Sequence, residues 1–83
     1  MTSAFFVYIL HSQVLGKYYV GFTSDVKRRL EHHNAGKNRF SKNGIPWTLV
    51  ASFPSTQKAE AHALEKKIKA RGAKRFLEDQ RLL

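Results

Sequence analysis

The chain has 83 residues, no cysteine and a formal net charge of +9. A chain of this length buries only about two-thirds of the surface that it exposes when unfolded, so we expect a single compact domain over residues 1–83. The absence of cysteine excludes a disulfide framework, Cys-ligated zinc and thiol catalysis. The hydrophobic content of 42% is enough for a core and argues against intrinsic disorder.

The composition also restricts where the protein is expected to act. No apolar run reaches the roughly 18 residues that a transmembrane helix needs, so no membrane partner is expected. Residues 1–3 lack the basic and apolar pattern of a signal peptide. These features predict a cytoplasmic protein.

Basic residues gather in two segments of the chain. Fifteen lysines and arginines stand against six acidic residues, with seven basic residues in 17–42 and seven in 55–75. The charge therefore belongs to expected folded elements rather than to a terminal tail, which favours a nucleic-acid partner. The alternatives are a soluble protein that happens to be basic and a small protein bound to ribosomal RNA.

The first two elements are expected to form a β-hairpin. Residues 4–10 are aromatic and β-branched, which favours a strand. Residues 11–16 begin with polar side chains and end in glycine, which is typical of a turn, and residues 17–22 again suit a strand.

Two tyrosines and a glycine are predicted to share one face of this hairpin. If the turn is centred between Gln13 and Val14, Tyr8 lies opposite Tyr19, and Gly21 leaves open space beside both phenols. The structural alternative is that tyrosines favour strands and that a Tyr–Tyr pair stabilises a sheet.

The rest of the chain is predicted to hold one more strand and three helices. Capping residues begin a helix over 23–36, which is followed by a basic loop over 37–45 and a strand over 46–54. Helices are expected over 55–70 and 73–83. The expected apolar contributors are Trp47, Leu49, Ala51 and Phe53 from the strand, Ala61, Leu64 and Ile68 from the long helix, and Phe76, Leu77 and Leu82 from the last helix. The order β-β-α-β-α-α predicts an α+β fold with a small three-stranded, mostly antiparallel sheet flanked by helices.

The helix over 23–36 places two polar side chains at the edge of its apolar stripe. Arg29 and His33 lie three and seven residues after Val26 and neighbour Leu30. A guanidinium at the edge of a core needs an anionic partner, either a carboxylate of the protein or a phosphate from outside. His33 is ambiguous by itself, because either it or His32 could be a solvated residue.

Glu65 raises the same question with the opposite charge. It lies at the margin of the apolar stripe of its helix, between Ala61 and Ile68. Glu65 can form a weak surface pair with Lys69 at i+4, or it can hold a divalent metal ion. One carboxylate together with waters and phosphate oxygens is an arrangement that Mg²⁺ prefers.

These residues form one pattern along the chain. Its parts are the tripeptides Phe6-Val7-Tyr8 and Tyr19-Val20-Gly21, then Thr23, Asp25, Arg29, Leu30 and His33, and finally Glu65, Ile68 and Lys69. The pattern resembles the GIY-YIG nuclease superfamily, whose members share the run Y-[IV]-G-x-[ST]-x-[DN]-x-x-x-R-[LW]-x-x-H and a later E-x-x-[IL]-K helix. The resemblance spans about residues 5–71. It is nearest to small stand-alone bacterial members, which are similar to the catalytic domains of structure-selective and repair nucleases.

The resemblance implies a divalent-metal-dependent endonuclease that hydrolyses DNA phosphodiester bonds with Mg²⁺ or Mn²⁺ and no small-molecule cofactor. Tyr8 and Tyr19 would belong to the active site, where one phenol orients or deprotonates the attacking water. Arg29 would stabilise charge on the phosphate, His33 would assist a proton transfer or bind phosphate, and Glu65 would hold the metal. A phenol with a pKa of about 10 is a poor base at neutral pH, so it needs such partners.

Surface cations are predicted to hold the nucleic-acid backbone. These nucleic-acid-binding candidates are Lys27, Arg28, Lys37, Arg39 and Lys42. A lone domain without a recognition helix or zinc finger should read backbone shape more than bases, which suits branched or nicked DNA. RNA as the substrate and the oligomeric state stay open at this point.

Two positions depart from the family pattern. Phe6 replaces the glycine of the first tripeptide, which should be tolerated because it precedes the functional tyrosine in a strand. Many active members carry a late Asn, whereas here no Asn follows Asn43 and Gln80 is the only amide in the tail. This difference favours the alternative function, a nucleic-acid-binding module of the same fold with little or no hydrolysis. The carboxylate of Glu65 favours the enzyme, because it would only repel the polyanion in a binding protein.

Overall fold

The computed structural model describes residues 4–83, and the N-terminal residues 1–3 that bear on a leader sequence lie outside the described residues. The elements are β1 (Phe5–Ser12), β2 (Lys17–Thr23), α1 (Val26–Asn34), the short 3-10 helix η1 (Lys42–Gly44), β3 (Trp47–Ser55), α2 (Lys58–Arg71) and α3 (Ala73–Asp79). The predicted order β-β-α-β-α-α is confirmed. None of the helices in residues 4–83 has the length and apolar character to cross a membrane.

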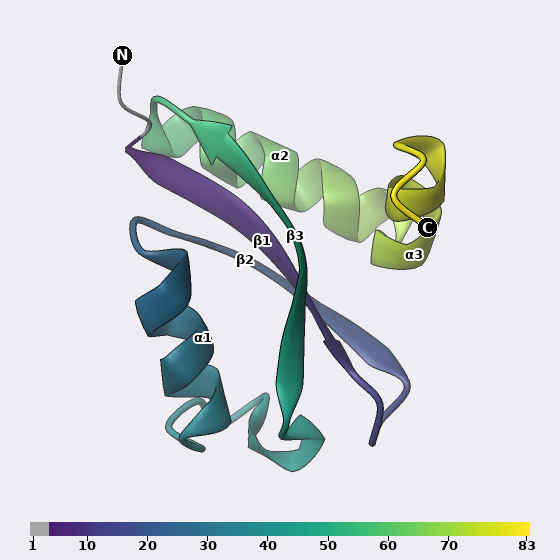
Figure 1. The fold of residues 1–83 in the computed structure, drawn as a ribbon. Helices are drawn as coiled ribbons and strands as arrows, with labels where there is room; N and C mark the ends of the chain where they lie inside the picture. The colour runs from purple at the N-terminus through teal and green to yellow at the C-terminus, as the bar shows by residue number, and fades with distance from the viewer. Residues whose placement is uncertain (1–3) are drawn as a thin grey trace.

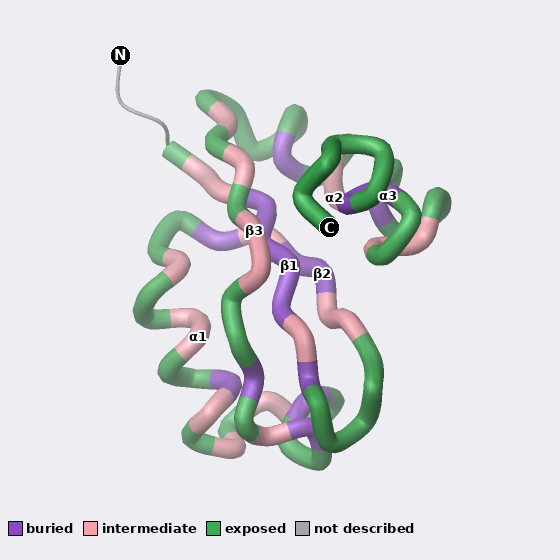
Figure 2. The backbone as a smooth tube through the Cα atoms, turned by 45° about the vertical axis from the view of Figure 1, so that its right-hand side comes forward, coloured by how far each residue is buried: buried purple, intermediate pink, exposed green. Residues whose placement is uncertain are grey.

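The three strands form one twisted antiparallel sheet in the order β2-β1-β3 (Figure 1). Helix α1 lies on one side of this sheet, and α2 and α3 lie on the other. The predicted α+β fold class is therefore confirmed, with helices covering both faces of the sheet. Buried residues concentrate on the central strand β1, whereas the outward surfaces of the helices are exposed (Figure 2).

Each face of the sheet has its own buried cluster. On the α2–α3 side the fully or nearly buried residues are Val7, Ile9, Val20, Ala61, Ile68, Phe76 and Leu77. On the α1 side they are Tyr8, Leu10 and Trp47, with Tyr19, Val26, Leu30 and Ile45 packed against them. Because successive side chains of a strand point to opposite faces, β1 supplies both clusters alternately.

The predicted hairpin register is wrong by two residues. Ser12 pairs with Lys17, so Tyr8 lies opposite Gly21 and not opposite Tyr19. The strand continues to Ser12 because residues 13–16 close a longer turn, in which Gly16 adopts a φ of +64. A shift of two residues leaves every side chain on its predicted face. Tyr8 and Tyr19 therefore still share one face, as diagonal neighbours.

The expected core contribution of β3 is wrong at Leu49, which is 39% exposed. Ile9 pairs with Ala51 but Leu10 pairs with Leu49, so one extra residue of β3 bulges between them. A bulge reverses the inward and outward alternation of a strand. Trp47 consequently packs under α1, whereas Ala51 packs under α2 and α3.

The helices begin near their predicted starts, and the last one ends early. Asp25 caps α1, and its side chain accepts the backbone N–H of Arg28 at 3.1 Å. Helix α3 ends at Asp79 and not at residue 83, and Leu82 is half exposed and outside the core, contrary to prediction. Phe76 and Leu77 are buried as predicted.

Candidate active site

The phenol of Tyr8 lies inside the molecule, under α1. Its side chain is almost fully buried, with 2% exposure. A Cβ added at Gly21 would lie only 2.6 Å from the Tyr8 hydroxyl oxygen, so any larger residue there would collide with the phenol. The glycine is thus required by the close approach of the opposite side chain.

A chain of buried hydrogen bonds extends from the Tyr8 hydroxyl. The Tyr8 oxygen lies 3.1 Å from Nε2 of His33, and Nδ1 of His33 lies 2.6 Å from Oγ of Ser41. His33 and Ser41 are both fully buried. Helix α1 supplies His33, and the following loop supplies Ser41, so both nitrogens of the imidazole are fixed by partners from separate elements.

The loop that carries Ser41 is held by Trp47 and Asn34. The indole N–H of Trp47 donates to the backbone carbonyl of Ser41 at 2.6 Å. The side chain of Asn34 accepts the backbone N–H of Trp47 at 2.6 Å and donates to its carbonyl at 3.1 Å. Sequence reasoning missed Ser41 and Asn34 in these roles, because a loop has no periodicity to signal which polar side chains turn inward.

Burial sets the protonation states of Tyr8 and His33 in this hydrogen-bonded series. Burial raises the pKa of the Tyr8 phenol well above its usual range; Tyr19 raises it further, Arg29 opposes the rise, and Glu65 adds to it. Burial lowers the pKa of His33, as do the positive charges of Arg29 and His32. At neutral pH the structure therefore holds a protonated phenol against a neutral imidazole.

Tyr19 lies beside the hydrogen-bonded residues Tyr8 and His33 but is only half buried. Its ring centroid lies 4.7 Å from that of His33 in an edge arrangement and 6.3 Å from that of Tyr8 in a stacked one. Trp47 contacts the Tyr19 ring by its edge, with 6.1 Å between centroids. The two phenols therefore differ, one being enclosed and the other open to the surface.

Arg29 and Glu65 lie on helices that cover opposite faces of the sheet, and both influence the pKa of the Tyr8 phenol. Arg29 lies half buried on α1, and Glu65 lies on α2 with a side chain only 14% exposed. The charges of both act on the Tyr8 hydroxyl. Lys69 lies 3.7 Å from the Glu65 carboxylate at i+4, so the predicted surface pair exists but is long.

The donor set fits a hard cation only if substrate completes it. Residues 4–83 contain no cluster of three or more His, Asp or Glu side chains suited to a metal. The shielded carboxylate of Glu65 is then the protein oxygen ligand that could hold Mg²⁺, with waters and phosphate oxygens as the others. The assignment of Glu65 as a metal ligand stays a prediction.

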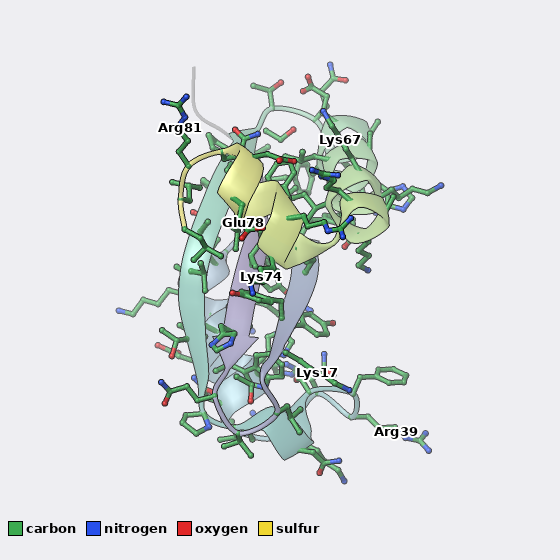
Figure 3. All side chains as sticks on the ribbon, turned by 90° about the vertical axis from the view of Figure 1, so that its right-hand side faces the viewer. Lys17, Arg39, Lys67, Lys74, Glu78 and Arg81 are labelled. Carbon is green, nitrogen blue, oxygen red and sulfur yellow. The ribbon has the colours of Figure 1, made fainter. Side chains whose placement is uncertain are left out.

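The predicted nucleic-acid-binding cations lie around α1 and the loop after it. Lys27 and Arg28 are exposed on α1, and Lys37, Arg39 and Lys42 are exposed in the loop and η1. Neither of the two ion pairs found in residues 4–83 involves these five cations. Lys17 and Arg39 lie toward one end of the molecule, and Lys67 and Arg81 lie toward the other (Figure 3).

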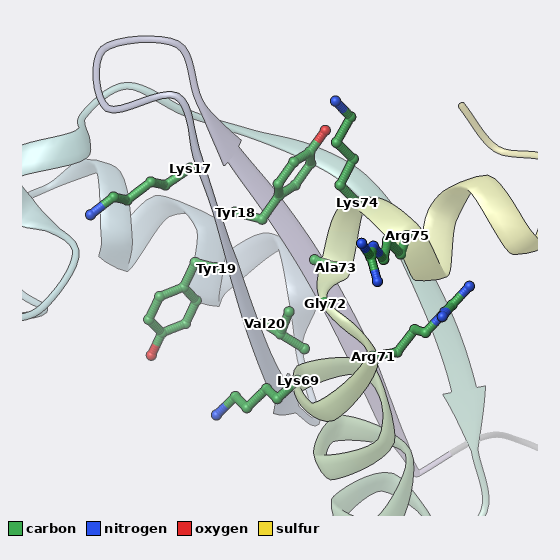
Figure 4. A pocket seen from close by; sticks show the side chains of 10 residues that line it. All are labelled: Lys17, Tyr18, Tyr19, Val20, Lys69, Arg71, Gly72, Ala73, Lys74 and Arg75. Carbon is green, nitrogen blue, oxygen red and sulfur yellow. The ribbon is translucent and has the colours of Figure 1, made fainter.

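A second basic surface, not singled out from the sequence, lines a hollow of about 680 Å³ at the β2 edge. Its cations are Lys17 on β2, Lys69 and Arg71 on α2, and Lys74 and Arg75 on α3. Figure 4 shows Lys17, Tyr19 and Lys69 pointing to the same side of β2. The open phenol therefore lies between two lysines that come from different elements.

Comparison with known proteins fits this geometry. The GIY-YIG catalytic domain matches residues 4–77. The chain belongs to the GIY-YIG family. This membership supports a nuclease function. The candidate site residues lie within the matched range, and their roles stay predictions: Tyr8, Tyr19, Arg29, His33 and Glu65.

Relatives of this GIY-YIG chain include small proteins and parts of larger ones. The UPF0213 protein BH0048 of Halalkalibacterium halodurans is 37% identical over 65 residues, which are 77% of this chain and 68% of that protein. The solution NMR structure of the UPF0213 protein BH0048 from Bacillus halodurans matches with a TM-score of 0.56 and 34% identity, covering 92% of this chain and 83% of that chain. The structure-specific endonuclease subunit SLX1 homolog of Leishmania infantum is 40% identical over 63 residues, 64% of this chain but 9% of that protein. The chain thus spans about two-thirds of the bacterial relatives' length and a small part of the endonuclease subunit.

Proposed function

We propose that this protein is a divalent-metal-dependent endonuclease that hydrolyses DNA phosphodiester bonds and selects DNA by structure rather than by sequence. The observation that carries the proposal is the buried Tyr8–His33–Ser41 chain, within reach of the charges of Arg29 and Glu65. The relatives named as structure-specific endonuclease subunits support selection by structure, and branched or nicked DNA is our choice of substrate within this proposal. A cytoplasmic location belongs to the same proposal.

Tyr8 takes the proton of the attacking water in this proposal without becoming a free phenolate. In the His33 tautomer that this proposal uses, the Tyr8 O–H donates to Nε2 of His33, and the Nδ1–H of His33 donates to Oγ of Ser41. As the water loses a proton to the Tyr8 oxygen, the Tyr8 proton passes to His33. The net change is water to hydroxide and imidazole to imidazolium. The hydroxide attacks phosphorus, the P–O bond to the leaving oxygen breaks, and that oxygen takes up a proton from solvent. The imidazolium then returns its proton through Tyr8 to solvent, so the protons balance. A neutral imidazole is required, which the lowered pKa of His33 provides.

The remaining residues stabilise charge and position the phosphate. Arg29 donates to the non-bridging oxygens as negative charge grows on them, since a guanidinium can donate to two oxygens at once. Tyr19 donates its O–H to the phosphate from the open side of β2. Glu65 would hold Mg²⁺ or Mn²⁺, which when bound supplies further charge stabilisation for the phosphate.

The basic surfaces support a path for the DNA backbone around the β2 edge. Lys27, Arg28 and the loop cations lie on the α1 side, and the cations of the hollow lie on the α2–α3 side. Such phosphate contacts fix position and register but carry no sequence information. The second candidate, a binding module without hydrolysis, is favoured by the missing late Asn.

The test is cleavage of a substrate panel under metal control. The protein is incubated with plasmid, single-stranded, nicked, flap and four-way branched DNA and with RNA, in Mg²⁺, Mn²⁺ or EDTA. We expect cleavage of the nicked or branched DNA with metal and none in EDTA. Binding of these DNAs without cleavage under any condition would assign the protein to the binding module.

Glu65→Gln tests the metal ligand, with Glu60→Gln as its matched control. Both residues lie on α2, but Glu60 is exposed and accepts the Thr56 hydroxyl at 2.9 Å, remote from the phenols in sequence and contacts. Glu65→Gln should lower cleavage by about two orders of magnitude or more and leave DNA binding equal or slightly tighter, because a negative charge near the polyanion is removed. Unchanged cleavage in Glu65→Gln, or cleavage that persists in EDTA, refutes the metal assignment.

A further inference from the structure

The loop between α1 and β3 presents an aromatic ring to solvent. Phe40 is 87% exposed, more than any other large hydrophobic residue in the described part of the chain; Val14 follows at 66%. The next residue, Ser41, is fully buried. Single exposed apolar side chains are common on protein surfaces, so exposure alone assigns nothing to Phe40.

The outward position of Phe40 is fixed by its backbone. Its N–H donates to Oδ1 of Asn38 at 2.9 Å, and the N–H of Ser41 donates to the same oxygen at 3.3 Å. The N–H of Lys42 donates to the Asn38 carbonyl at 3.1 Å. The ring therefore projects from a hydrogen-bonded turn whose next residue is locked into the candidate active site.

The ring also emerges next to the proposed chemistry. Ser41 Oγ lies 2.6 Å from His33, and consecutive Cα atoms are only about 3.8 Å apart, so Phe40 begins one residue from the proton-transfer chain. Exposed Arg39 and Lys42 flank it. No Asp or Glu occurs in residues 32–59, so the formally charged side chains of this segment are all basic.

We propose that Phe40 stacks on an unpaired nucleobase beside the scissile phosphate, while Arg39 and Lys42 hold the neighbouring phosphates. An aromatic ring set among cations is the combination that binds single-stranded nucleic acid, since every base offers a π face. A second copy of this chain is a poor occupant, because it would bring another +9 charge against the same basic segment. This inference rests on the proposed function and assigns its selectivity to DNA with unpaired bases.

The test measures binding in EDTA, so that it is independent of cleavage. A flap DNA carries 2-aminopurine at the first unpaired position, and a fully paired duplex of the same sequence is the reference. Phe40→Ala should weaken flap binding about fivefold to a hundredfold and leave duplex binding within about twofold. The wild type should quench the 2-aminopurine fluorescence by stacking, and Phe40→Ala should not.

Three further variants separate stacking from general apolar contact. Phe40→Tyr keeps a π face and should retain flap binding, whereas Phe40→Leu should not. Val14→Ala is the matched control, since Val14 is an exposed apolar residue at the hairpin tip without a cation within two residues. Equal losses on flap and duplex, or full activity of Phe40→Leu in flap binding, would overturn the stacking proposal.

The outcomes also distinguish this inference from the endonuclease proposal. Quenching and flap preference in a wild type that never cleaves would support the Phe40 site and reject the nuclease. Cleavage with unchanged flap binding in Phe40→Ala would do the reverse. If Phe40→Ala instead abolishes a concentration-dependent dimer in sedimentation, the ring is a self-association contact and the base-stacking site is refuted.

Discussion

The two faces of the sheet are both buried, but the side chains that cover them differ in polarity. The face under α2 and α3 is packed by aliphatic side chains and phenylalanine, including Ile9, Ile68 and Leu77. The face under α1 buries the hydroxyls and the imidazole of Tyr8, Ser41 and His33 among its apolar neighbours.

The difference teaches what burial does on each face. Apolar burial is non-directional, so the α2–α3 face stabilises the fold with little demand on angle. Buried polar groups must find partners, and in residues 4–83 no buried side-chain nitrogen or oxygen lacks one. The α1 face is therefore fixed in geometry, which is what proton transfer needs. Of two adjacent residues, Tyr8 therefore belongs to the hydrogen-bonded α1 face and Ile9 to the apolar α2–α3 face.

Removing the Tyr8 hydroxyl should have the largest effect on cleavage. Tyr8→Phe should lower the rate by about 10²–10⁴-fold, because the proposed proton acceptor is lost. It should also lower the free energy of unfolding by about 1–3 kcal/mol, since a nitrogen of His33 loses its partner. Cleavage rate per folded molecule and urea unfolding measure the two effects. Cleavage by Tyr8→Phe at the wild-type rate would remove this phenol from the mechanism.

Arg29 should matter more to turnover than to affinity. Arg29→Ala should lower the rate by about 10²–10³-fold, with poor rescue by Arg29→Lys, because an ammonium lacks the planar fork. Its positive charge lowers the pKa of His33, so the acidic limb of the pH–rate profile should move to higher pH in Arg29→Ala. Lys27→Ala is the control on the exposed side of α1, and an equal loss in both variants would contradict the proposed role of Arg29.

Ile9→Ala tests the aliphatic face next to Tyr8. Ile9 is fully buried, so the variant should lose about 2–5 kcal/mol of unfolding free energy through lost transfer energy and the cavity left behind. Cleavage per folded molecule should stay near the wild-type rate, because the side chain points away from the phenols. A comparable fall in that rate would mean that the two faces are not separable.

The contribution of the hollow at the β2 edge to DNA binding can be tested through the salt dependence of affinity. The double variant of Lys74→Ala with Arg75→Ala removes two cations of the hollow. If both contact duplex phosphates, the slope of log affinity against log salt should become shallower by about 1.8. The double variant of Lys66→Ala with Lys67→Ala removes the same charge from exposed positions on α2 and should change the slope little. Equal changes would mean that the hollow is no preferred phosphate site.

The smallest expected effect is a pH dependence of stability. Because the pKa of His33 is lower in the folded chain, the unfolded chain binds more protons between that pKa and about 6.5. The contribution of neutral His33 to the free energy of unfolding should therefore be fully present above about pH 6.5, and it should decline as the pH falls below that value. Urea unfolding at about pH 7.5 and about pH 5 should show a smaller decline in His33→Gln than in the wild type. His62→Gln, at an exposed position, should retain the decline.

The sequence by itself determined the fold class, the order of the elements and the face of each strand of the hairpin. These properties depend on periodicities of two and 3.6 residues, which are local to each element. The same logic placed Arg29 and Glu65 at the margins of buried stripes, where the structure has them. The family resemblance predicted that these residues share one active site with Tyr8 and Tyr19.

Tertiary structure alone decided how the elements meet. The β3 bulge at Val50 depends on pairing between strands far apart in the chain, and the hairpin register depends on which turn residues 13–16 adopt when the strands pair. Both differ from prediction. The inward turn of Ser41 depends on His33 and on the Trp47 indole, neither of which is its neighbour in sequence. A loop side chain has no repeating pattern to reveal its direction, so its partners become evident only when strand, helix and loop are packed together.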